Sequence, residues 1–200
     1  MHAKSPLEPR EDPLEQFELW FAEASESAIR LPDAVALATV DSGGRAAVRM
    51  VLYKGISDGG LTFFTNYESR KGQHLQTTGY AAMVFYWEPL ERQVRFEGPV
   101  SRLSAAQSDA YFATRSRASR VAARASIQSR PYRERTEILE RYAEIDTRFK
   151  DTEIPRPDFW GGYKLVPERA EFWTGMPHRF HDRVEFRRSD GGWEWCRLQP

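Results

Sequence analysis

The chain has 200 residues, 40% hydrophobic and 13% aromatic, which is enough to build one domain with a sizeable core. Lysine plus arginine and aspartate plus glutamate both number 29, so no overall charge favours nucleic acid or an anionic membrane. No apolar run approaches the roughly 20 residues of a membrane-spanning helix. Cys196 stands alone and the polar N-terminal residues lack a signal-peptide core, so we expect a cytoplasmic protein. The common zinc, hydrolase and dinucleotide motifs are missing, and no metal is predicted.

In chain order, residues 1–11 are polar and contain proline, and we expect a mobile arm before a single domain over 12–200. Asp12 and Pro13 are typical of a helix start, and apolar spacing predicts a helix over 14–28. A short helix is predicted over 68–77. Strands are predicted over 35–40, 45–54, 61–65, 80–87 and 90–103. Five strands with short returns indicate an antiparallel sheet that closes into a barrel, in a mainly β, α+β fold.

The second half of the chain adds helices and then further strands. Ser104 and Gln107 form a capping-box signature for a helix through Thr114. An arginine-rich segment leads into a helix predicted over 132–150, in which glutamate alternates with arginine. This pattern is typical of a solvated face with ion pairs, so nucleic-acid binding is not expected. Strands are predicted over 160–165, 170–173, 183–188 and 193–198, the last two as a hairpin.

Two segments carry candidate functional residues. The hairpin over 49–71 ends in Ser69, Arg70 and Lys71, where a helix begins, so backbone N–H groups, the helix dipole and positive charge coincide. We expect a phosphate site there, the alternative being solvated cations at a sheet rim. In the loop over 173–183, Arg179, His181 and Arg183 alternate, and an extended backbone would point them to one side; a charged rim loop is the alternative. His74 is expected to be a solvated residue of a surface helix.

Nine short motifs together resemble one family. They are Arg49-x-Val-Leu-x-Lys54, Phe64-Thr65-Asn66, Ser69-Arg70-Lys71, Leu90-Glu91-Arg92-Gln93-Val94, Tyr111-Phe112-x-x-Arg115-x-x-x-Ser119, Gln128-Ser129, Phe159-Trp160-Gly161-Gly162, Glu171-Phe172-Trp173 and His178-Arg179-x-His181-Asp182-Arg183. In this order and with these spacings, the chain from about residue 12 to residue 200 resembles the pyridoxamine (pyridoxine) 5′-phosphate oxidases. The resemblance implies an FMN-binding split β-barrel and a homodimer with FMN at the subunit interface.

The resemblance also implies a site and a reaction. It implies FMN contacts from Arg49, Met50, Val51, Leu52, Lys54, Phe64, Thr65, Ser69, Arg70, Lys71, Gln93, Gln128, Ser129, Trp173 and Arg183, with Gln128 and Ser129 coming from the other subunit. It places the substrate phosphate on Lys54, Tyr111, Arg115 and Ser119, and the catalytic residues Arg179 and His181 over the pyridine ring. The implied reaction converts pyridoxamine or pyridoxine 5′-phosphate to pyridoxal 5′-phosphate: a hydride passes from C4′ to flavin N5, O2 reoxidises the flavin, and H2O2 is released.

Local geometry gives two further expectations. Tyr111, Arg115 and Ser119 are spaced i, i+4 and i+8, and on a continuous helix they would share a face. Arg49 and Lys54 would lie on opposite faces of a regular strand, and a bulge would resolve this.

Three features depart from the family pattern: Phe64 replaces a usual tyrosine, residues 121–124 differ, and the N-terminal arm is short. A phenazine-type flavin oxidase, or a split-barrel protein that binds flavin or pyridoxal phosphate without turnover, are the alternatives.

Overall fold

The computed structural model describes residues 6–200, and residues 1–5 of the expected N-terminal arm lie outside the described residues. The helices are α1 (Pro13–Glu26), α2 (Arg70–Thr78), α3 (Ala105–Thr114), α4 (Arg117–Ala125) and α5 (Arg135–Arg148), with 3-10 turns η1 (Glu88–Leu90) and η2 (Pro177–Arg179). The strands are β1 (Ala34–Val40), β2 (Ala46–Ser57), β3 (Gly60–Asn66), β4 (Tyr80–Trp87), β5 (Arg92–Arg102), β6 (Trp160–Leu165), β7 (Arg169–Thr174), β8 (Asp182–Ser189) and β9 (Gly192–Arg197).

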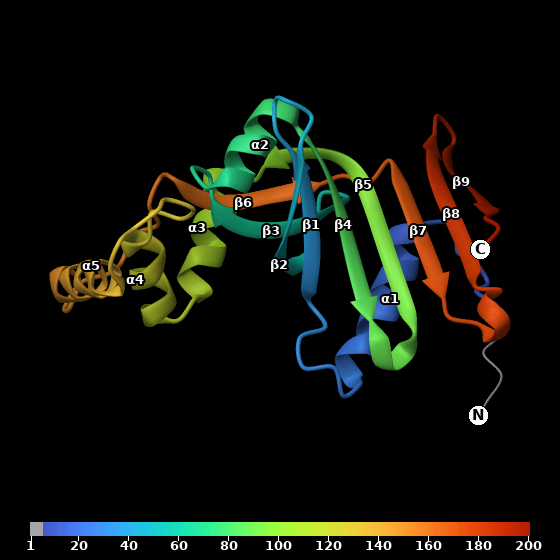
Figure 1. The fold of residues 1–200 in the computed structure, drawn as a ribbon, viewed down its shortest axis with the longest axis horizontal. Coiled ribbons are helices and arrows are strands. Elements are labelled where there is room, and N and C mark those ends of the chain that lie inside the picture. Colours follow the sequence, from blue (N-terminus) through green and yellow to red (C-terminus); the bar gives the residue numbers. More distant parts are fainter. Residues whose placement is uncertain (1–5) are drawn as a thin grey trace.

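Six strands close into an antiparallel barrel. They follow the order β4-β1-β2-β3-β6-β5, and pairing between β4 and β5 completes the ring. Strand β5 is long enough to pair with β4 and β7 along most of its length and with β6 at its end, so β7, β8 and β9 extend the sheet beyond the barrel. The expected antiparallel barrel is confirmed. Figure 1 shows α3, α4 and α5 on one side of the barrel and β7, β8 and β9 on the other.

Helix α1 supplies a large part of the barrel core. The Asp12 side chain accepts a hydrogen bond from the Leu14 amide, and Pro13 occupies the first turn, as the sequence pattern predicts. The helix turns Leu14, Phe17 and Trp20 inward, and the fully buried Phe17 ring contacts aromatic rings from β2, β4 and β5. This burial of aromatic surface fixes the helix on the sheet.

Helices α3, α4 and α5 form a separate layer, and here one expectation is wrong. The Ser104–Gln107 capping box is present, but α3 ends at Thr114, Arg115 has extended backbone angles, and Ser116 caps a new helix. Tyr111, Arg115 and Ser119 therefore do not share one helical face. A hydroxyl that caps a following helix competes with continuation of the preceding one, which explains the break. No residue of α5 is buried, in keeping with its charged pattern.

The C-terminal strands hold two further findings. The 173–183 segment is not extended, because His178 and Arg179 have φ values of 56° and 63° and form η2, so the expected alternation from Arg179 to Arg183 is wrong. Leu7 lies against this region: its amide donates to Asp182 Oδ2 at 2.7 Å, and its carbonyl accepts from Arg197 Nη2 at 2.8 Å. Within residues 6–200, no helix is both long and apolar enough to cross a bilayer.

Candidate active site

A cavity of about 370 Å³ opens between the barrel and the helical layer. Its walls come from β2, β3 and β6 of the barrel, from α2, α3 and α4, and from the connections that follow α3 and α4. The lining residues are Met50, Val51, Leu52, Lys54, Phe64, Thr65, Asn66, Lys71, Tyr111, Arg115, Ala122, Ala123, Ser126, Gln128 and Trp160. Among these described residues three are cations and none is a carboxylate, so the cavity is suited to an anionic ligand.

One group of cations gathers at the start of α2. Ser69 caps the helix, and Lys71, only 8% exposed, donates from Nζ to Thr65 Oγ1 at 3.1 Å, Ser69 Oγ at 3.3 Å and Gln128 Oε1 at 3.3 Å. Burial, and secondly the charge of Arg49, lower the pKa of Lys71 to about 8. Gln128 thus contacts this group within its own chain.

Arg49 and Arg70 complete the group. Burial, followed by the charge of Arg70, lowers the pKa of Arg49. Arg49 Nη1 donates to Leu37 O at 2.9 Å and to Thr39 Oγ1 at 2.8 Å, and Thr39 Oγ1 lies 3.1 Å from His74 Nδ1. His74 is buried, not solvated as expected, because α2 turns it toward β1. Like charges held this close, beside a helix N-terminus, favour a multiply charged anion.

The second group of cations consists of Arg115, between α3 and α4, and Lys54 on β2. Arg115 stacks over Trp160, with its guanidinium carbon 4.7 Å from the ring centroid, and burial lowers the pKa of Arg115. Its Nη1 is buried and has no hydrogen-bond partner within residues 6–200. Lys54 lies at a register shift of β2 between Tyr53 and Ile56, which is the bulge expected from its five-residue offset from Arg49. Its Nζ pairs with Asp33 Oδ2 at 2.7 Å.

Aromatic rings form the wall beside Arg115. The rings of Phe64 and Tyr111 stack with centroids 3.8 Å apart and an interplanar angle of 15°, and Trp160 lies nearly parallel to both. Phe64 fits this stack without a hydroxyl group. A rigid stack of this kind holds the Arg115 guanidinium and gives the cavity an apolar, flat side.

The remaining predicted residues fall into a second cluster. Gln93, Trp173 and Arg183 are register partners and form one row across β5, β7 and β8. The His181 ring lies 4.7 Å from that of Trp173, and its Nδ1 accepts from the Met176 amide at 3.2 Å.

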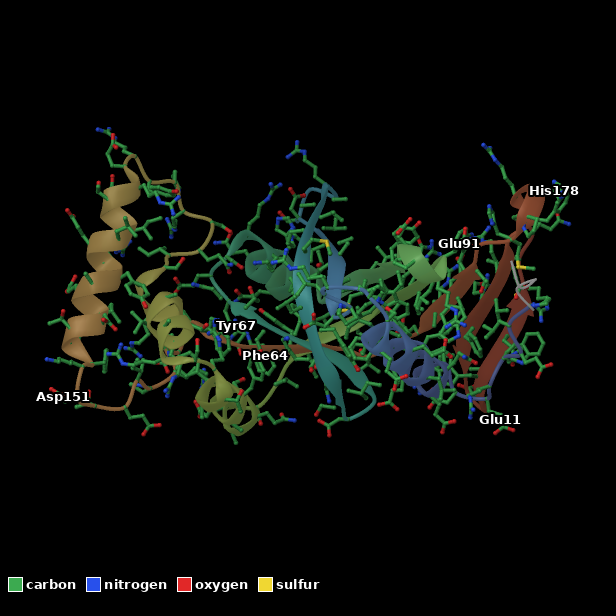
Figure 2. The ribbon with its side chains drawn as sticks, turned by 90° about the horizontal axis from the view of Figure 1, so that it is seen from below. Glu11, Phe64, Tyr67, Glu91, Asp151 and His178 are labelled. Carbon is green, nitrogen blue, oxygen red and sulfur yellow. The ribbon has the colours of Figure 1, made fainter. Side chains whose placement is uncertain are left out.

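Neither this row nor Arg179 and His181 line the cavity of the same chain. Figure 2 shows Phe64 and His178, which marks the η2 turn, well apart along the molecule. Ser119, whose Oγ contacts Ser116 Oγ, and Ser129, in the left-handed region, also lie outside the lining residues.

Several lining residues carry no assignment from the sequence. Trp160 lies in the Phe159-Trp160-Gly161-Gly162 motif, which marks it in the sequence, but the motif does not predict its contact with Arg115. Ala122 and Ala123 let α4 approach the cavity because their side chains are small. Asp33 does not line the cavity but pairs with Lys54, and it becomes recognisable only when folding brings the two together, since they are far apart in sequence. No local pattern signals such a pair.

Comparisons with known proteins bear on the whole chain. Residues 21–147 match the family model described as pyridoxamine 5′-phosphate oxidase, and residues 160–200 match the model described as the pyridoxine 5′-phosphate oxidase C-terminal dimerisation region. The pyridoxine/pyridoxamine 5′-phosphate oxidase of Cupriavidus necator is 52% identical over 190 residues, covering 94% of this chain and 89% of that protein. The protein of that name from Azotobacter vinelandii is 49% identical over 204 residues, covering 100% and 95%.

Solved structures share the fold. The crystal structure of PhzG from Burkholderia lata in complex with tetrahydrophenazine-1-carboxylic acid superposes with a TM-score of 0.91 at 32% identity, covering 96% of this chain and 95% of that one. A pyridoxamine 5′-phosphate oxidase-related, FMN binding protein from Nostoc punctiforme gives a TM-score of 0.75 at 19% identity, covering 94% and 98%, and supports the fold alone. With two family models matched in order and relatives near 50% identity over almost its full length, the chain belongs to the pyridoxamine 5′-phosphate oxidase family.

Proposed function

We propose that this protein is an FMN-dependent oxidase that converts pyridoxamine or pyridoxine 5′-phosphate to pyridoxal 5′-phosphate. One observation carries the proposal: a single cavity has cations from two sources, Lys71 at the start of α2, and Lys54 with Arg115 at its other walls. FMN and the phosphorylated vitamer each bring one phosphate group. Two phosphates need two sets of basic side chains, and the cavity provides both.

The residues around α2 fit the FMN phosphate. Arg49, Arg70 and Lys71 supply positive charge, the helix N-terminus supplies its dipole, and neutral donors or acceptors surround them at Thr65, Ser69 and Gln128. Among residues 6–200 these three cations have no carboxylate partner, and such a group is costly unless an anion joins it. When bound, FMN supplies the redox chemistry by accepting the electrons that C4′ of the vitamer loses.

The residues around Arg115 fit the substrate phosphate. Its buried, unpartnered Nη1 is a donor that a phosphate oxygen would satisfy, and the stack with Trp160 fixes its direction. Lys54 adds a second cation, and the Tyr111 ring forms the adjoining wall. Because Ser119 lies outside the cavity lining, we assign the phosphate to Lys54, Tyr111 and Arg115.

The second cluster would reach the cavity of the other subunit in a homodimer. The C-terminal dimerisation region, residues 160–200, contains Trp173, Arg179, His181 and Arg183. Alternate apolar residues of β2 beside the cavity are exposed in one chain, Val48 at 69% and Met50 at 61%, which suits a face covered by a second copy. We therefore propose that these C-terminal residues of the partner subunit complete each site, with Arg179 stabilising charge that develops on the vitamer ring and His181 orienting its substituents.

We also propose that O2 takes up the electrons and leaves as H2O2, and that the protein works in the cytoplasm. Its one cysteine, Cys196, is free and exposed, which suits a reducing compartment.

An activity assay tests the proposed function. Purified protein with FMN should release H2O2 with pyridoxine 5′-phosphate and almost none with unphosphorylated pyridoxine, because the substrate-side cations act on the phosphate. Equal rates with the two compounds would contradict the proposal. Anaerobic addition of pyridoxamine 5′-phosphate should bleach the visible flavin absorbance, and bound FMN without bleaching or peroxide would instead indicate a non-catalytic binding protein.

A second candidate is a flavin oxidase that acts on a reduced phenazine carboxylate. The observation in its favour is the close superposition with PhzG, whose structure contains tetrahydrophenazine-1-carboxylic acid. A carboxylated tricycle would need fewer cations than the two sets present in this cavity. Oxidation of that compound at a rate comparable to or above that of pyridoxine 5′-phosphate would favour this candidate.

A further inference from the structure

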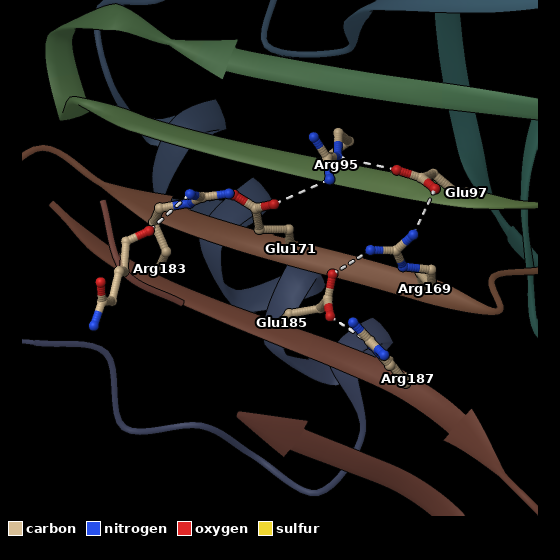
Figure 3. A network of polar contacts seen from close by, with 8 residues as sticks. Arg95, Glu97, Arg169, Glu171, Arg183, Glu185 and Arg187 are labelled. Atoms are coloured by element: carbon tan, nitrogen blue, oxygen red, sulfur yellow. Dashed lines mark hydrogen bonds and ion pairs between the residues drawn. The ribbon is translucent and has the colours of Figure 1, made fainter. Parts of the chain in front are cut away.

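The outer face of β5, β7 and β8 carries a cross-strand ladder of arginine and glutamate (Figure 3). The ladder consists of Arg95, Glu97, Arg169, Glu171, Arg183, Glu185 and Arg187. Its two central carboxylates, Glu171 and Glu185, are register partners on β7 and β8. Both are buried beneath the arginine side chains, at 4% and 2% exposed. A buried carboxylate is stable only with such partners, so each of the two depends on the arginines that pair with it.

Glu171 differs from Glu185 in the arginine that it holds. Glu171 Oε1 accepts from Arg183 Nε at 2.9 Å, and Oε2 lies 3.0 Å from Arg95 Nη2. Arg183 belongs to the row of Gln93 and Trp173, and reaches Glu171 as a diagonal cross-strand neighbour. Glu185 instead binds Arg169 at 2.5 Å and Arg187 at 2.6 Å, neither of which is a proposed site residue.

Two contacts fix the guanidinium plane of Arg183. Besides the bond from Nε to Glu171, Nη1 donates to the Gln199 carbonyl at 2.9 Å. Nε and Nη1 belong to one rigid planar group and are bound from two different directions, so the two hydrogen bonds together restrict rotation of the guanidinium. A long side chain held in this way loses less freedom when it binds a ligand.

We infer that Glu171 is a positioning residue of the flavin site, which acts by holding the Arg183 guanidinium in place. The inference rests on the proposed function, because Arg183 has its role only in a site that binds FMN. It assigns a task to the glutamate of the Glu171-Phe172-Trp173 motif, whose carboxylate lines no part of the cavity. The competing reading is that Glu171 serves the stability of the ladder alone, as Glu185 does.

The test compares two isosteric variants of the full-length holoenzyme, Glu171→Gln and Glu185→Gln. Each loses one buried carboxylate with two arginine partners, so both should lower Tm by a similar amount. Free FMN is measured after ultrafiltration of the holoenzyme at a series of dilutions. We expect the FMN Kd to rise about tenfold in Glu171→Gln and to stay within about twofold of the wild type in Glu185→Gln.

A double-mutant cycle separates positioning from stability. If Glu171 acts through Arg183, the variant Glu171→Gln/Arg183→Met should bind FMN no more weakly than Arg183→Met alone. Additive losses of FMN affinity, or equal Kd changes in Glu171→Gln and Glu185→Gln, would overturn the inference. The proposed function would still stand in that case, provided that the wild-type protein is an active oxidase. A wild-type protein that neither retains FMN nor oxidises pyridoxine 5′-phosphate would overturn the proposed function itself, and the inference with it.

Discussion

Lys71 illustrates how a single buried ammonium group links the sequence to ligand binding. Its partners within the described chain are the neutral oxygens of Thr65, Ser69 and Gln128, and burial brings its pKa from the ordinary 10.5 to about 8. The folded protein without a ligand therefore binds this proton less tightly than the unfolded chain does. Its stability should rise as pH increases from about 8 towards 10.5, as the disfavoured charge is lost.

The same pKa predicts how FMN affinity varies with pH. Above about pH 7 the phosphate is a dianion of constant charge, since its second pKa is about 6. Below a pH of about 8 Lys71 is already charged, so the Kd of FMN should not change with pH. Above that pH Lys71 is neutral in the free protein and must take up a proton when FMN binds, so the Kd should rise by up to about tenfold per pH unit. FMN titrations of the apoprotein from about pH 7 to about 9.5 would measure this curve.

Lys71→Arg is the matched control, because arginine keeps its charge throughout that range. Its Kd should show no inflection near the pKa of Lys71. A wild-type curve that is flat, or an inflection that persists in Lys71→Arg, would show that another group controls the pH dependence.

At the scale of elements, β6 limits the shape of the cavity through its glycines. A Cβ atom added to Gly162 would lie 2.5 Å from Leu103 Cδ1 and 2.8 Å from Phe64 Cε1, so one of these side chains has to move. Phe64 is already stacked on Tyr111 at 3.8 Å and cannot retreat in that direction without disturbing the cavity wall. The strand therefore needs a residue without a side chain at this position.

Gly162→Ala should consequently destabilise the protein by about 1–3 kcal/mol, as overpacking of a core commonly does, and should raise KM for pyridoxine 5′-phosphate. Thermal unfolding and steady-state kinetics would measure the two effects. Gly191→Ala is the control, since a Cβ at Gly191 meets nothing within 4 Å, and it should leave both quantities unchanged. A Gly162→Ala variant with wild-type Tm and KM would contradict the role given to this strand.

Elements were predictable where local chemistry decides them. The N-cap at Asp12 and the capping box at Ser104 appear where sequence signals place them. The helix predicted through Thr114 ends at that residue, but the shared face of Tyr111, Arg115 and Ser119 does not form, because a spacing of four residues is equally compatible with one long helix and with two. Ser116 caps α4 by accepting a hydrogen bond from the Ser119 amide at 3.2 Å, and the sequence alone does not distinguish such a cap from a serine inside one helix.

At the scale of the whole molecule, the motifs name the proposed site residues but do not show how the fold distributes them. The contact between Lys71 and Gln128 joins segments 57 residues apart, and only the fold shows that the two residues meet within one chain. The row of Gln93, Trp173 and Arg183 lies outside the cavity of its own chain. A motif identifies a residue's type and place in the sequence, whereas symmetry decides which copy of it meets the ligand.

This distribution predicts complementation between damaged subunits. Arg115→Ala removes a cavity cation and Arg179→Ala removes a residue of the second cluster, so each homodimer should lose about tenfold or more in kcat/KM. A heterodimer purified by two different tags pairs one intact cavity with one intact C-terminal cluster. If each site combines both subunits, one of its two sites is fully wild type, and the heterodimer should show roughly half of the wild-type activity.

The control heterodimer combines Arg115→Ala with Lys54→Ala, two changes that fall on the same side of the site. Both of its cavities are then damaged, each by one substitution, and no pairing of subunits restores either of them. Activity should therefore stay at the level of the parent homodimers. If the Arg115→Ala/Arg179→Ala heterodimer behaved like this control, the cavity and the C-terminal cluster would have to act within a single chain or at separate sites, and the shared-site arrangement would be wrong.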